Sequence, residues 1–382
     1  MSTLVCFPFV GDLVGGSHVS AAGLIRRLDP ARYPSLVLLQ HPDGAMARFF
    51  AEAGIATEAA PASPALTHGR GVSPMSAARL VATSLRLRAF LRARGIGIVH
   101  SNDGRSHATW GLAAKMARSR LLWHHRGAPD AAGLRIVAPL LADRVVSVSS
   151  FSAPRPGRYS AAGRTRVIRS PFDNDMRHDR RAARAALAAL VPAGGGSRFI
   201  AFAGVMIDRK RPLLFVDAIA ALHARHPELD VAGVMLGEAL DGMDLRVRER
   251  AASAGVAGRI HLLGHRAPGA YWLAGSDLLM VPAVDEPFGR TLVEAMLVGT
   301  PVVATRSGGN VEAIVDGMTG LLVAPEDADA LAAACARLLD EPALADALAL
   351  AATQDARARF GEQAHADAVM AVYDEMLGDG AR

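Results

Sequence analysis

The sequence predicts an α/β protein built from two consecutive doubly wound domains. Its 382 residues are about twice the length of one ordinary domain. Short apolar runs rich in β-branched residues alternate with longer Ala- and Leu-rich helical patterns, which is typical of parallel sheets covered by helices on both faces. A polar and then Ala-rich stretch that ends in three glycines interrupts this pattern near the middle, and it indicates the connection between the domains.

The first half of the chain predicts five buried strands. Each is a short apolar run followed by turn residues or by a helical segment rich in Ala, Leu and Arg. Because strands and helices alternate, the strands should lie parallel, with the ligand-binding loops at their carboxyl ends. The predicted strands lie at 4–10, 35–40, 97–100, 120–125 and 144–149.

The second half restarts the same pattern after the glycines. We expect a first domain over residues 1–172, a linker region over 173–197 and a second domain over 198–360. The C-terminal helix, about 361–382, is expected to pack back on the first domain. The six strands predicted in the second domain lie at 198–204, 230–237, 259–264, 277–283, 301–305 and 320–323.

Composition narrows the class of protein. Hydrophobic residues make up 51% of the chain and charged residues 21%, so it can bury large cores and is not a disordered chain. The two cysteines, Cys6 and Cys335, have no metal-site or redox spacing, which argues against structural zinc. The run 4–10 lacks the basic residues that precede a signal peptide, and no apolar run is long enough to span a membrane. We therefore expect a cytoplasmic protein.

Charge is distributed unevenly between the halves. Residues 1–172 contain 22 Lys and Arg against 8 Asp and Glu, whereas residues 173–382 contain 20 against 29. A basic half favours anionic partners, such as the inner face of a membrane or nucleic acid. A helix predicted at 79–94 is either an amphipathic helix that packs on the sheet or a membrane contact; the alternating Leu and Arg residues at 85–88 favour packing. Its arginines are Arg79, Arg86, Arg88, Arg92 and Arg94.

The segment DEPFGRTLVEAM at 285–296 gathers both signs of charge at one predicted helix start. A helix that begins near Gly289 directs its positive dipole end and its first N–H groups forward, and Arg290 adds a cation there. Glu286 and Glu294 flank that start. We interpret the N–H groups and Arg290 as an anion site, and the two carboxylates as acceptors for neutral hydroxyl groups on either side of the anion.

This segment, followed by GTPVVAT at 299–305 and the GGN turn at 308–310, closely resembles the retaining nucleotide-sugar glycosyltransferases of family four, the glycosyl transferases group 1. The resemblance implies the GT-B fold, in which two doubly wound, Rossmann-like domains face each other across a cleft. It implies that Glu294 binds the donor ribose and that Glu286 holds hydroxyls of the donor sugar. It also implies contacts of the donor diphosphate with the helix start, formed by Phe288, Gly289, Arg290, Thr291 and Leu292.

FAGVMIDRKRP at 202–212 resembles the family's first loop of the nucleotide domain. There Lys210 matches a lysine that contacts the diphosphate, while Val205 replaces the family's arginine. Arg209 is the candidate that supplies the missing charge from another backbone position. A solvated turn is the alternative interpretation of Arg209. HLLGHR at 261–266 resembles the strand and loop beside the base, with Gly264 and His265 as candidate contacts.

The first half resembles the acceptor side of the same family. Gly15 and Gly16 match a glycine loop that opens the first helix, where the alternative is a simple tight turn. In WHHRG at 123–127, His124 is the first choice for the family's histidine at the donor sugar; His125 is the alternative because neighbouring strand residues face opposite ways. A buried structural histidine is the competing interpretation. Weaker acceptor-side candidates are His18, His125 and Arg126.

The resemblance implies a retaining, metal-independent glycosyltransferase with Glu286, His124 and Lys210 as catalytic residues. The partners expected are a nucleoside-diphosphate sugar, such as a UDP or GDP sugar, and a saccharide or lipid-linked acceptor of cell-surface polysaccharide, lipopolysaccharide or glycolipid synthesis. No cofactor, metal or nucleic acid is expected. The alternatives are a sugar-nucleotide epimerase of the same fold and a non-enzymatic carbohydrate or nucleic-acid binder. The Asp-x-Asp pattern at 327–329 imitates a metal site but is better explained as a helix cap.

Overall fold

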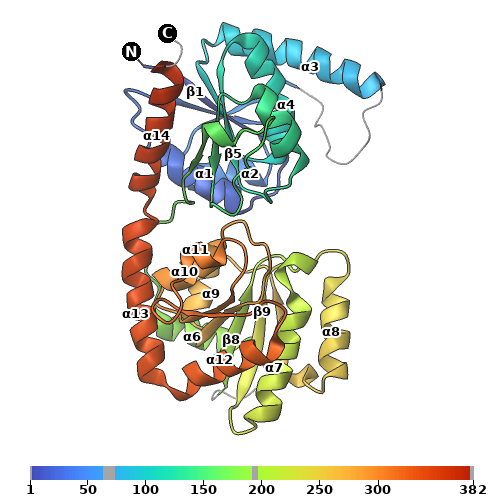
Figure 1. Cartoon of the computed structure of the whole chain (residues 1–382), viewed down its shortest axis with the longest axis vertical. Helices are drawn as coiled ribbons and strands as arrows, with labels where there is room; N and C mark the ends of the chain where they lie inside the picture. Colours follow the sequence, from blue (N-terminus) through green and yellow to red (C-terminus); the bar gives the residue numbers. More distant parts are fainter. Residues whose placement is uncertain (1, 63–73, 192–196, 379–382) are drawn as a thin grey trace. The chain divides into compact units, whose positions relative to one another are not determined.

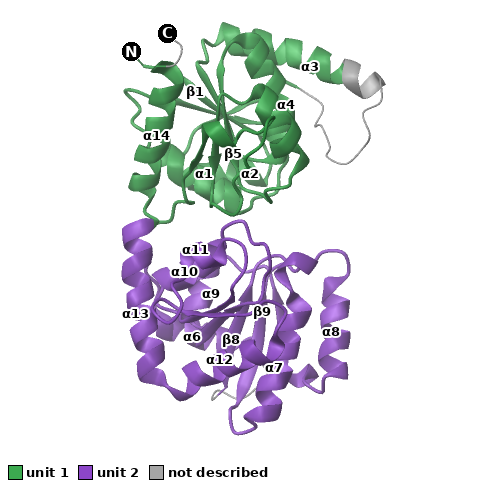
Figure 2. Cartoon of the chain, viewed as in Figure 1, with its two compact units in different colours: residues 1–173, 360–382 green, residues 174–359 purple. Residues whose placement is uncertain are grey.

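The computed structural model describes residues 2–62, 74–191 and 197–378. It divides the chain into two compact units, unit 1 with residues 1–173 and 360–382 and unit 2 with residues 174–359 (Figure 2). Each unit contains a wholly parallel sheet with helices on both faces (Figure 1). This is the α/β architecture that the alternation of apolar runs and helical patterns predicts.

The sheet of unit 1 has the strand order β3-β2-β1-β4-β5-β6-β7. All five strands predicted in the first half are present. The structure adds β3 and β7, which are edge strands of three residues each. The bounds are β1 Val5–Phe9, β2 Ser35–Leu39, β3 Thr57–Ala59, β4 Ile98–Ser101, β5 Arg120–His125, β6 Arg144–Ser147 and β7 Thr165–Val167.

Two groups of helices cover this sheet. On one face α1, α2 and α14 bury Leu24, Phe50 and Tyr373 against the strands. On the other face α3 and α4 bury Leu91 and Trp110. The bounds are α1 Gly16–Arg27, α2 Ala45–Glu52, α3 Pro74–Ala93, α4 Gly104–Ala117, a π-helix Gly133–Val137, α5 Ala138–Leu141, a 3₁₀ turn Ala162–Arg164 and α14 Glu362–Gly378.

The sheet of unit 2 has the order β10-β9-β8-β11-β12-β13. Strands β9 and β10 lie on one side of β8, whereas β11, β12 and β13 follow on its other side, so the strand order reverses beside β8. All six predicted strands are present, and this reversal places the loops after β8 and β11 side by side at their carboxyl ends, where open α/β sheets bind ligands. The bounds are β8 Arg198–Ala203, β9 Val231–Leu236, β10 Ile260–Gly264, β11 Leu278–Val281, β12 Val302–Thr305 and β13 Leu321–Val323.

The helices of unit 2 also form two layers. Residues of α7, α8 and α12, among them Phe215, Val247 and Leu331, pack into one core with the strands. Helix α10 contacts α9 and α13, and α6 contacts α9. The bounds are α6 Arg180–Ala188, a 3₁₀ turn Asp208–Lys210, α7 Pro212–Arg225, α8 Met243–Ser253, a 3₁₀ turn Ala257–Arg259, α9 Gly269–Ala274, α10 Arg290–Leu297, α11 Asn310–Ala313, α12 Ala328–Asp340 and α13 Pro342–Arg359.

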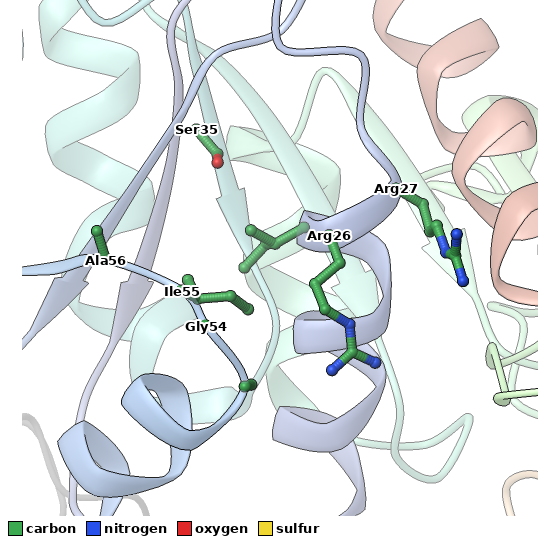
Figure 3. Close-up of a pocket in the computed structure, with 8 residues that line it drawn as sticks. Arg26, Arg27, Ser35, Gly54, Ile55 and Ala56 are labelled. Carbon is green, nitrogen blue, oxygen red and sulfur yellow. The ribbon is translucent and has the colours of Figure 1, made fainter. Parts of the chain in front are cut away.

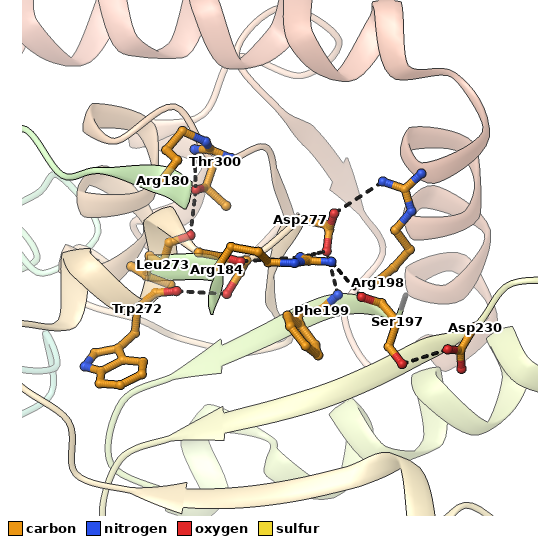
Figure 4. A network of polar contacts seen from close by, with 12 residues as sticks. Arg180, Arg184, Ser197, Arg198, Phe199, Asp230, Trp272, Leu273, Asp277 and Thr300 are labelled. Atoms are coloured by element: carbon orange, nitrogen blue, oxygen red, sulfur yellow. Dashed lines mark hydrogen bonds and ion pairs between the residues drawn. The ribbon is translucent and has the colours of Figure 1, made fainter. Parts of the chain in front are cut away.

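The region predicted as a linker, 173–197, differs from that expectation, because the structure assigns residues from 174 onward to unit 2. Helix α6 buries Ala183 and Leu187 completely. The Arg184 guanidinium pairs with the carboxylate of Asp277 and donates to the Ser197 carbonyl at 2.6 Å (Figure 4). A buried apolar stripe and a charged anchor therefore make this segment part of the second unit's packing.

Helix α14 belongs to unit 1, the domain on which the sequence places it. The Glu362 carboxylate accepts from Arg26 Nη2 at 2.7 Å and from Arg27 Nε at 3.2 Å. Farther along, the Tyr33 hydroxyl donates to Asp374 Oδ1 at 2.6 Å. These polar contacts lie along α14, and the apolar side of the same helix packs into the unit 1 core. Helix α14 therefore completes the packing of the first domain.

Candidate functional site in unit 2

Helix α10 starts at the residue that the sequence predicts. Gly289 precedes it with φ +81°, a left-handed conformation that a residue with a Cβ adopts only under strain. A Cβ at this position would also lie 3.3 Å from Oδ1 of Asn310. No side chain caps this helix start among the described residues, so its first N–H groups remain suited to an anion.

The GGN turn supports the loop in front of α10. The Gly309 N–H donates to the Glu286 carbonyl at 2.6 Å, and the Asp285 N–H donates to Ser307 Oγ at 3.0 Å. At Gly308 a Cβ would lie 2.6 Å from the backbone N and O of Glu286, so only glycine permits this approach. The turn therefore fixes the backbone of the Glu286 loop.

Glu286 forms a charged cluster with the loop after β8. Its Oε2 lies 2.8 Å from Lys210 Nζ and also pairs with an Arg209 guanidinium nitrogen. Only 10% of the Glu286 side chain is exposed. Burial alone would raise the pKa of Glu286, but Lys210 and Arg209 outweigh it and hold the pKa below its ordinary value. Glu286 is therefore ionised at neutral pH.

Glu294 occupies the first turns of α10 with a different electrostatic environment. Its Oε1 lies 3.4 Å from Arg290 Nη2, four residues earlier on the same helix. Burial raises the pKa of Glu294, and the charges of Arg290 and Lys210 offset only part of that effect. Three cations and two carboxylates of unit 2 thus surround one helix start, which gives a net positive site between hydrogen-bond acceptors.

The other predicted contacts of unit 2 lie at the same edge of the sheet but differ in exposure. Phe288 and Leu292 are buried in the core, so only their backbone groups can serve a ligand. Gly264 and His265 are exposed at the end of β10, and Thr291 is half-buried. Val205 is exposed on the loop after β8, while Arg209 and Lys210 follow on the 3₁₀ turn. The arginine that pairs with Glu286 is therefore Arg209, whereas Val205 at the family's arginine position supplies no charge.

Sequence reasoning missed Gly204 and the role of Asn310. With φ +131°, Gly204 lies beside Lys210, and a Cβ there would be 3.6 Å from Lys210 Nζ. Asn310 donates from Nδ2 to the Thr305 carbonyl at 3.1 Å and keeps Oδ1 next to Gly289. The GGN turn in the sequence could have indicated Asn310. The contact of Gly204 with Lys210 could not be predicted, because it depends on where the Lys210 side chain lies in the folded protein.

The Asp-x-Asp pattern at 327–329 is a helix cap, as the sequence predicts. Asp327 precedes α12, and its Oδ1 accepts from the Ala330 N–H at 2.8 Å. Among the residues that the structure describes, no group of three His, Cys, Asp or Glu side chains is arranged to hold a metal ion.

Candidate residues in unit 1

The predicted residues of unit 1 lie after β1 and at the end of β5. Gly15 and Gly16 are exposed at the start of α1. The Gly15 N–H donates to His18 Nδ1 at 3.0 Å, so this ring helps cap the helix. Burial lowers the pKa of His18; nearby Arg126 acts in the same direction and Asp103 opposes it. His18 is therefore a neutral acceptor at the helix start.

His124 and His125 face opposite sides of the sheet. Nε2 of His125 donates to the Ala128 carbonyl at 2.9 Å. His124 is fully buried on the α14 side, where its Nδ1 lies 3.0 Å from His100 Nε2. Arg126 Nη2 donates to the same Nδ1 at 3.4 Å. The structure thus brings His124 and Arg126 together and separates them from His125.

A surface pocket of unit 1 contains none of the predicted site residues. It has a volume of about 610 Å³ and lies between the last turn of α1, the first residue of β2 and the connection from α2 to β3 (Figure 3). Ser35 opens β2, so the pocket is at the amino ends of the strands, opposite the edge that carries His124. Arg26 and Arg27 line it, but both pair with Glu362.

Comparison with known proteins shows which family the sequence of the chain matches. Residues 197–341 match the family described as "Glycosyl transferases group 1". A lipopolysaccharide core biosynthesis mannosyltransferase of Rhizobium leguminosarum bv. viciae is 33% identical over 240 residues, 62% of this chain and 66% of that protein. A D-inositol 3-phosphate glycosyltransferase of Arthrobacter sp. is 36% identical over 185 residues, 48% and 43%. The matches thus span about two thirds or less of these relatives.

Solved structures extend the likeness to the whole chain. The Anabaena protein HepE in complex with UDP-glucose aligns with a TM-score of 0.79 and 21% identity over 97% of this chain and 99% of that one. A sucrose-phosphate synthase of Thermosynechococcus elongatus aligns with a TM-score of 0.71 and 19% identity over 99% and 100%. Through residues 197–341 the chain belongs to the glycosyl transferases group 1 family, and over its length it has the GT-B fold of these proteins.

Proposed function

We propose that the chain is a retaining glycosyltransferase that moves a sugar from a nucleoside-diphosphate sugar to a hydroxyl group of a saccharide or lipid-linked acceptor. The observation that carries this proposal is the charged cluster at the start of α10, where Lys210 and Arg209 meet Glu286 and where Arg290 meets Glu294. The name of the Rhizobium leguminosarum relative supports a role in the synthesis of lipopolysaccharide core, and the name of the Arthrobacter relative supports glycosyl transfer.

The arrangement suits a diphosphate with a sugar at each end. The N–H groups of α10, Lys210 and Arg290 supply the positive charge that a diphosphate requires. Glu294, one turn into the helix, leans toward its start and can accept hydrogen bonds from a ribose. Glu286 is ionised and can accept from hydroxyls of the transferred sugar. This pairing of charge and acceptors accounts for both signs of charge at one helix start.

In the proposed reaction, the bond from the anomeric carbon to the diphosphate breaks while a bond to the acceptor oxygen forms on the same face of the sugar. The acceptor's proton passes to the departing phosphate oxygen. Lys210, Arg290 and the α10 N–H groups stabilise the charge that grows on the diphosphate. These fixed cations perform the role that a divalent ion performs in other transferases, so we propose that EDTA leaves the rate unchanged.

A donor screen tests the proposal directly. The chain is incubated with UDP, GDP and ADP sugars and candidate glycan or lipid acceptors, and products are analysed by mass spectrometry and proton NMR. A new glycosidic bond with the donor's anomeric configuration is the expected result. Inversion of configuration would contradict the retaining mechanism. An altered free nucleotide sugar without an acceptor product would instead identify an epimerase.

Gly289→Ala is expected to weaken nucleoside-diphosphate binding by about tenfold, because a Cβ strains the φ of +81° and reaches toward Asn310 at the phosphate site. Gly317→Ala is the matched control, since Gly317 has φ +72° with nothing within 4 Å of its added Cβ. Both variants should lose about 1 kcal/mol of unfolding free energy. Isothermal titration calorimetry compares their affinities, and equal affinities would argue against a phosphate contact at Gly289.

We also propose that α3 contacts an anionic membrane surface. Leu87 and Leu91 are fully buried on the sheet side of α3, whereas Val81 and Leu85 are 49% and 45% exposed. The alternation of Leu and Arg at 85–88 therefore places one leucine in each environment. Arg86 and Arg92 are exposed as well. Exposed apolar and cationic side chains together suit the interface of an anionic bilayer, and within the described ranges no helix is long and apolar enough to cross one.

Replacing Arg86, Arg88 and Arg92 by Gln should lower the affinity for vesicles of phosphatidylglycerol and phosphatidylcholine by about a hundredfold, since each arginine near such a surface contributes about 1 kcal/mol. A control variant replaces three arginines of α8, namely Arg246, Arg248 and Arg250. It removes the same charge from unit 2. Co-sedimentation measures the affinity of each variant for the vesicles. Equal losses of affinity in the two variants would show that binding depends on net charge and not on α3.

A further inference from the structure

A buried chain of hydrogen bonds links the last helix to the strand end that carries His124. The Tyr373 hydroxyl of α14 lies 2.5 Å from Nδ1 of His100 on β4. Nε2 of His100 lies 3.0 Å from Nδ1 of His124 on β5. All three side chains are fully buried. Nε2 of His124, at the end of this chain, has no hydrogen-bond partner among the residues that the structure describes.

Both imidazoles are neutral at physiological pH. Burial holds the pKa of His100 and of His124 well below the ordinary value, and the positive charge of Arg126 acts in the same direction. Each neutral ring carries one proton, on either Nδ1 or Nε2. The neighbours of the two rings therefore decide which nitrogen donates and which accepts.

Two independent contacts select the same arrangement. Arg126 Nη2 donates to Nδ1 of His124, and a guanidinium is only a donor, so this Nδ1 carries the lone pair. At the other end, the Tyr373 hydroxyl proton has His100 Nδ1 as its acceptor. If His100 instead donated from Nδ1, that hydroxyl would lose its acceptor in the core, and an unmade buried hydrogen bond is costly.

We infer that Tyr373 and His100 are positioning residues that fix His124 as its Nε2–H tautomer, so that its unpartnered N–H is kept as a hydrogen-bond donor for the proposed reaction. The proton order is then Tyr373 O–H to His100 Nδ1, and His100 Nε2–H to His124 Nδ1. The use of this donor in catalysis rests on the proposed glycosyltransferase function. The tautomer itself depends only on the described contacts of unit 1, so the two can fail separately.

The inference gives α14 a function besides packing. Its Tyr373 contributes the hydroxyl that orients two histidines on neighbouring strands, and His365 of the same helix stacks on His124 with ring centroids 5.8 Å apart. An apolar residue at 373 would complete the core equally well. The hydroxyl is therefore the feature of this position that the hydrogen-bond chain requires.

The test uses the full chain with ¹⁵N-labelled histidine and long-range ¹H–¹⁵N NMR spectra. His124 is assigned from the signal lost in His124→Gln. Wild type should show His124 protonated at Nε2 alone, and Tyr373→Phe should mix the two tautomers. His100→Gln retains an amide N–H that can reach His124 Nδ1 and should keep the Nε2–H form, whereas His100→Met should lose it.

Tyr33→Phe is the matched control, because it removes a hydroxyl that bonds to Asp374 on the same helix and leaves the histidines untouched. In a transfer assay Tyr373→Phe should lower kcat about fivefold, the value of one hydrogen bond, with KM nearly unchanged. Tyr33→Phe should keep the wild-type kcat. A wild-type His124 protonated at Nδ1, or a spectrum that neither Tyr373→Phe nor His100→Met alters, would overturn the inference. The expected spectra without any transferase activity would instead refute the proposed function.

Discussion

Glu286→Gln is expected to reduce sugar transfer by about a hundredfold or more while it strengthens the binding of free nucleoside diphosphate. The loss in rate follows if the carboxylate stabilises the positive charge that develops on the sugar, since removal of one such electrostatic contact typically costs this much. The gain in binding has a separate cause. Lys210 and Arg209 both pair with Oε2 of Glu286, so the neutral amide releases two cations for the phosphates.

The gain should be about tenfold, which corresponds to one additional charge-assisted hydrogen bond to the diphosphate. Calorimetric titration with UDP and GDP measures it, and a radiolabelled sugar assay measures the rate. Glu326→Gln is the control, because Glu326 pairs with the neighbouring Arg211 and 53% of its side chain is exposed. Near-normal turnover by Glu286→Gln would show that the Glu286 carboxylate is not required for sugar transfer.

Lys210→Met should have the opposite effect on the same ligands. The Lys210 side chain is only 14% exposed, and its ammonium group lies 2.8 Å from Oε2 of Glu286. Without it, the affinity for a nucleoside diphosphate should fall about tenfold to a hundredfold, the range expected for a hydrogen bond to a charged group. Affinity for the corresponding nucleoside should change little, because it carries no phosphate.

Competition titrations with matched nucleoside, monophosphate and diphosphate separate these contributions. Arg211→Met is the comparison, since it removes the next cation along the chain, which pairs with Glu326. It should leave all three affinities close to those of the wild type. Equal losses for nucleoside and diphosphate in Lys210→Met would show that the lysine maintains the pocket's structure and does not contact phosphate.

Local patterns were enough to predict the elements around α10. The start at Gly289, the two glutamates and the GGN turn all lie within one short stretch, where backbone geometry and spacing follow directly from residue type. The parallel strands were also predictable because they are buried apolar runs. Edge strands β3 and β7 were missed, because three residues such as Thr57–Ala59 carry no periodic signal.

Contacts between distant parts of the sequence could not be predicted. Glu286 receives its cations from a loop 76 and 77 residues earlier, and the His100–Tyr373 bond spans 273 residues. The charge of Arg209 could be proposed from sequence, but its position on Glu286 depends on the fold of both loops. Likewise, the segment before β8 resembles a linker in the sequence because Asp277, which anchors its Arg184, lies 93 residues later in the chain.

A crystal structure of the chain with a bound nucleoside-diphosphate sugar tests the central claim most directly. The account predicts phosphate density at the first N–H groups of α10, within hydrogen-bonding distance of Lys210 and Arg290, with the ribose at Glu294 and the transferred sugar at Glu286. A nucleotide bound elsewhere, with both glutamates in solvent or still paired with the same cations, would contradict it.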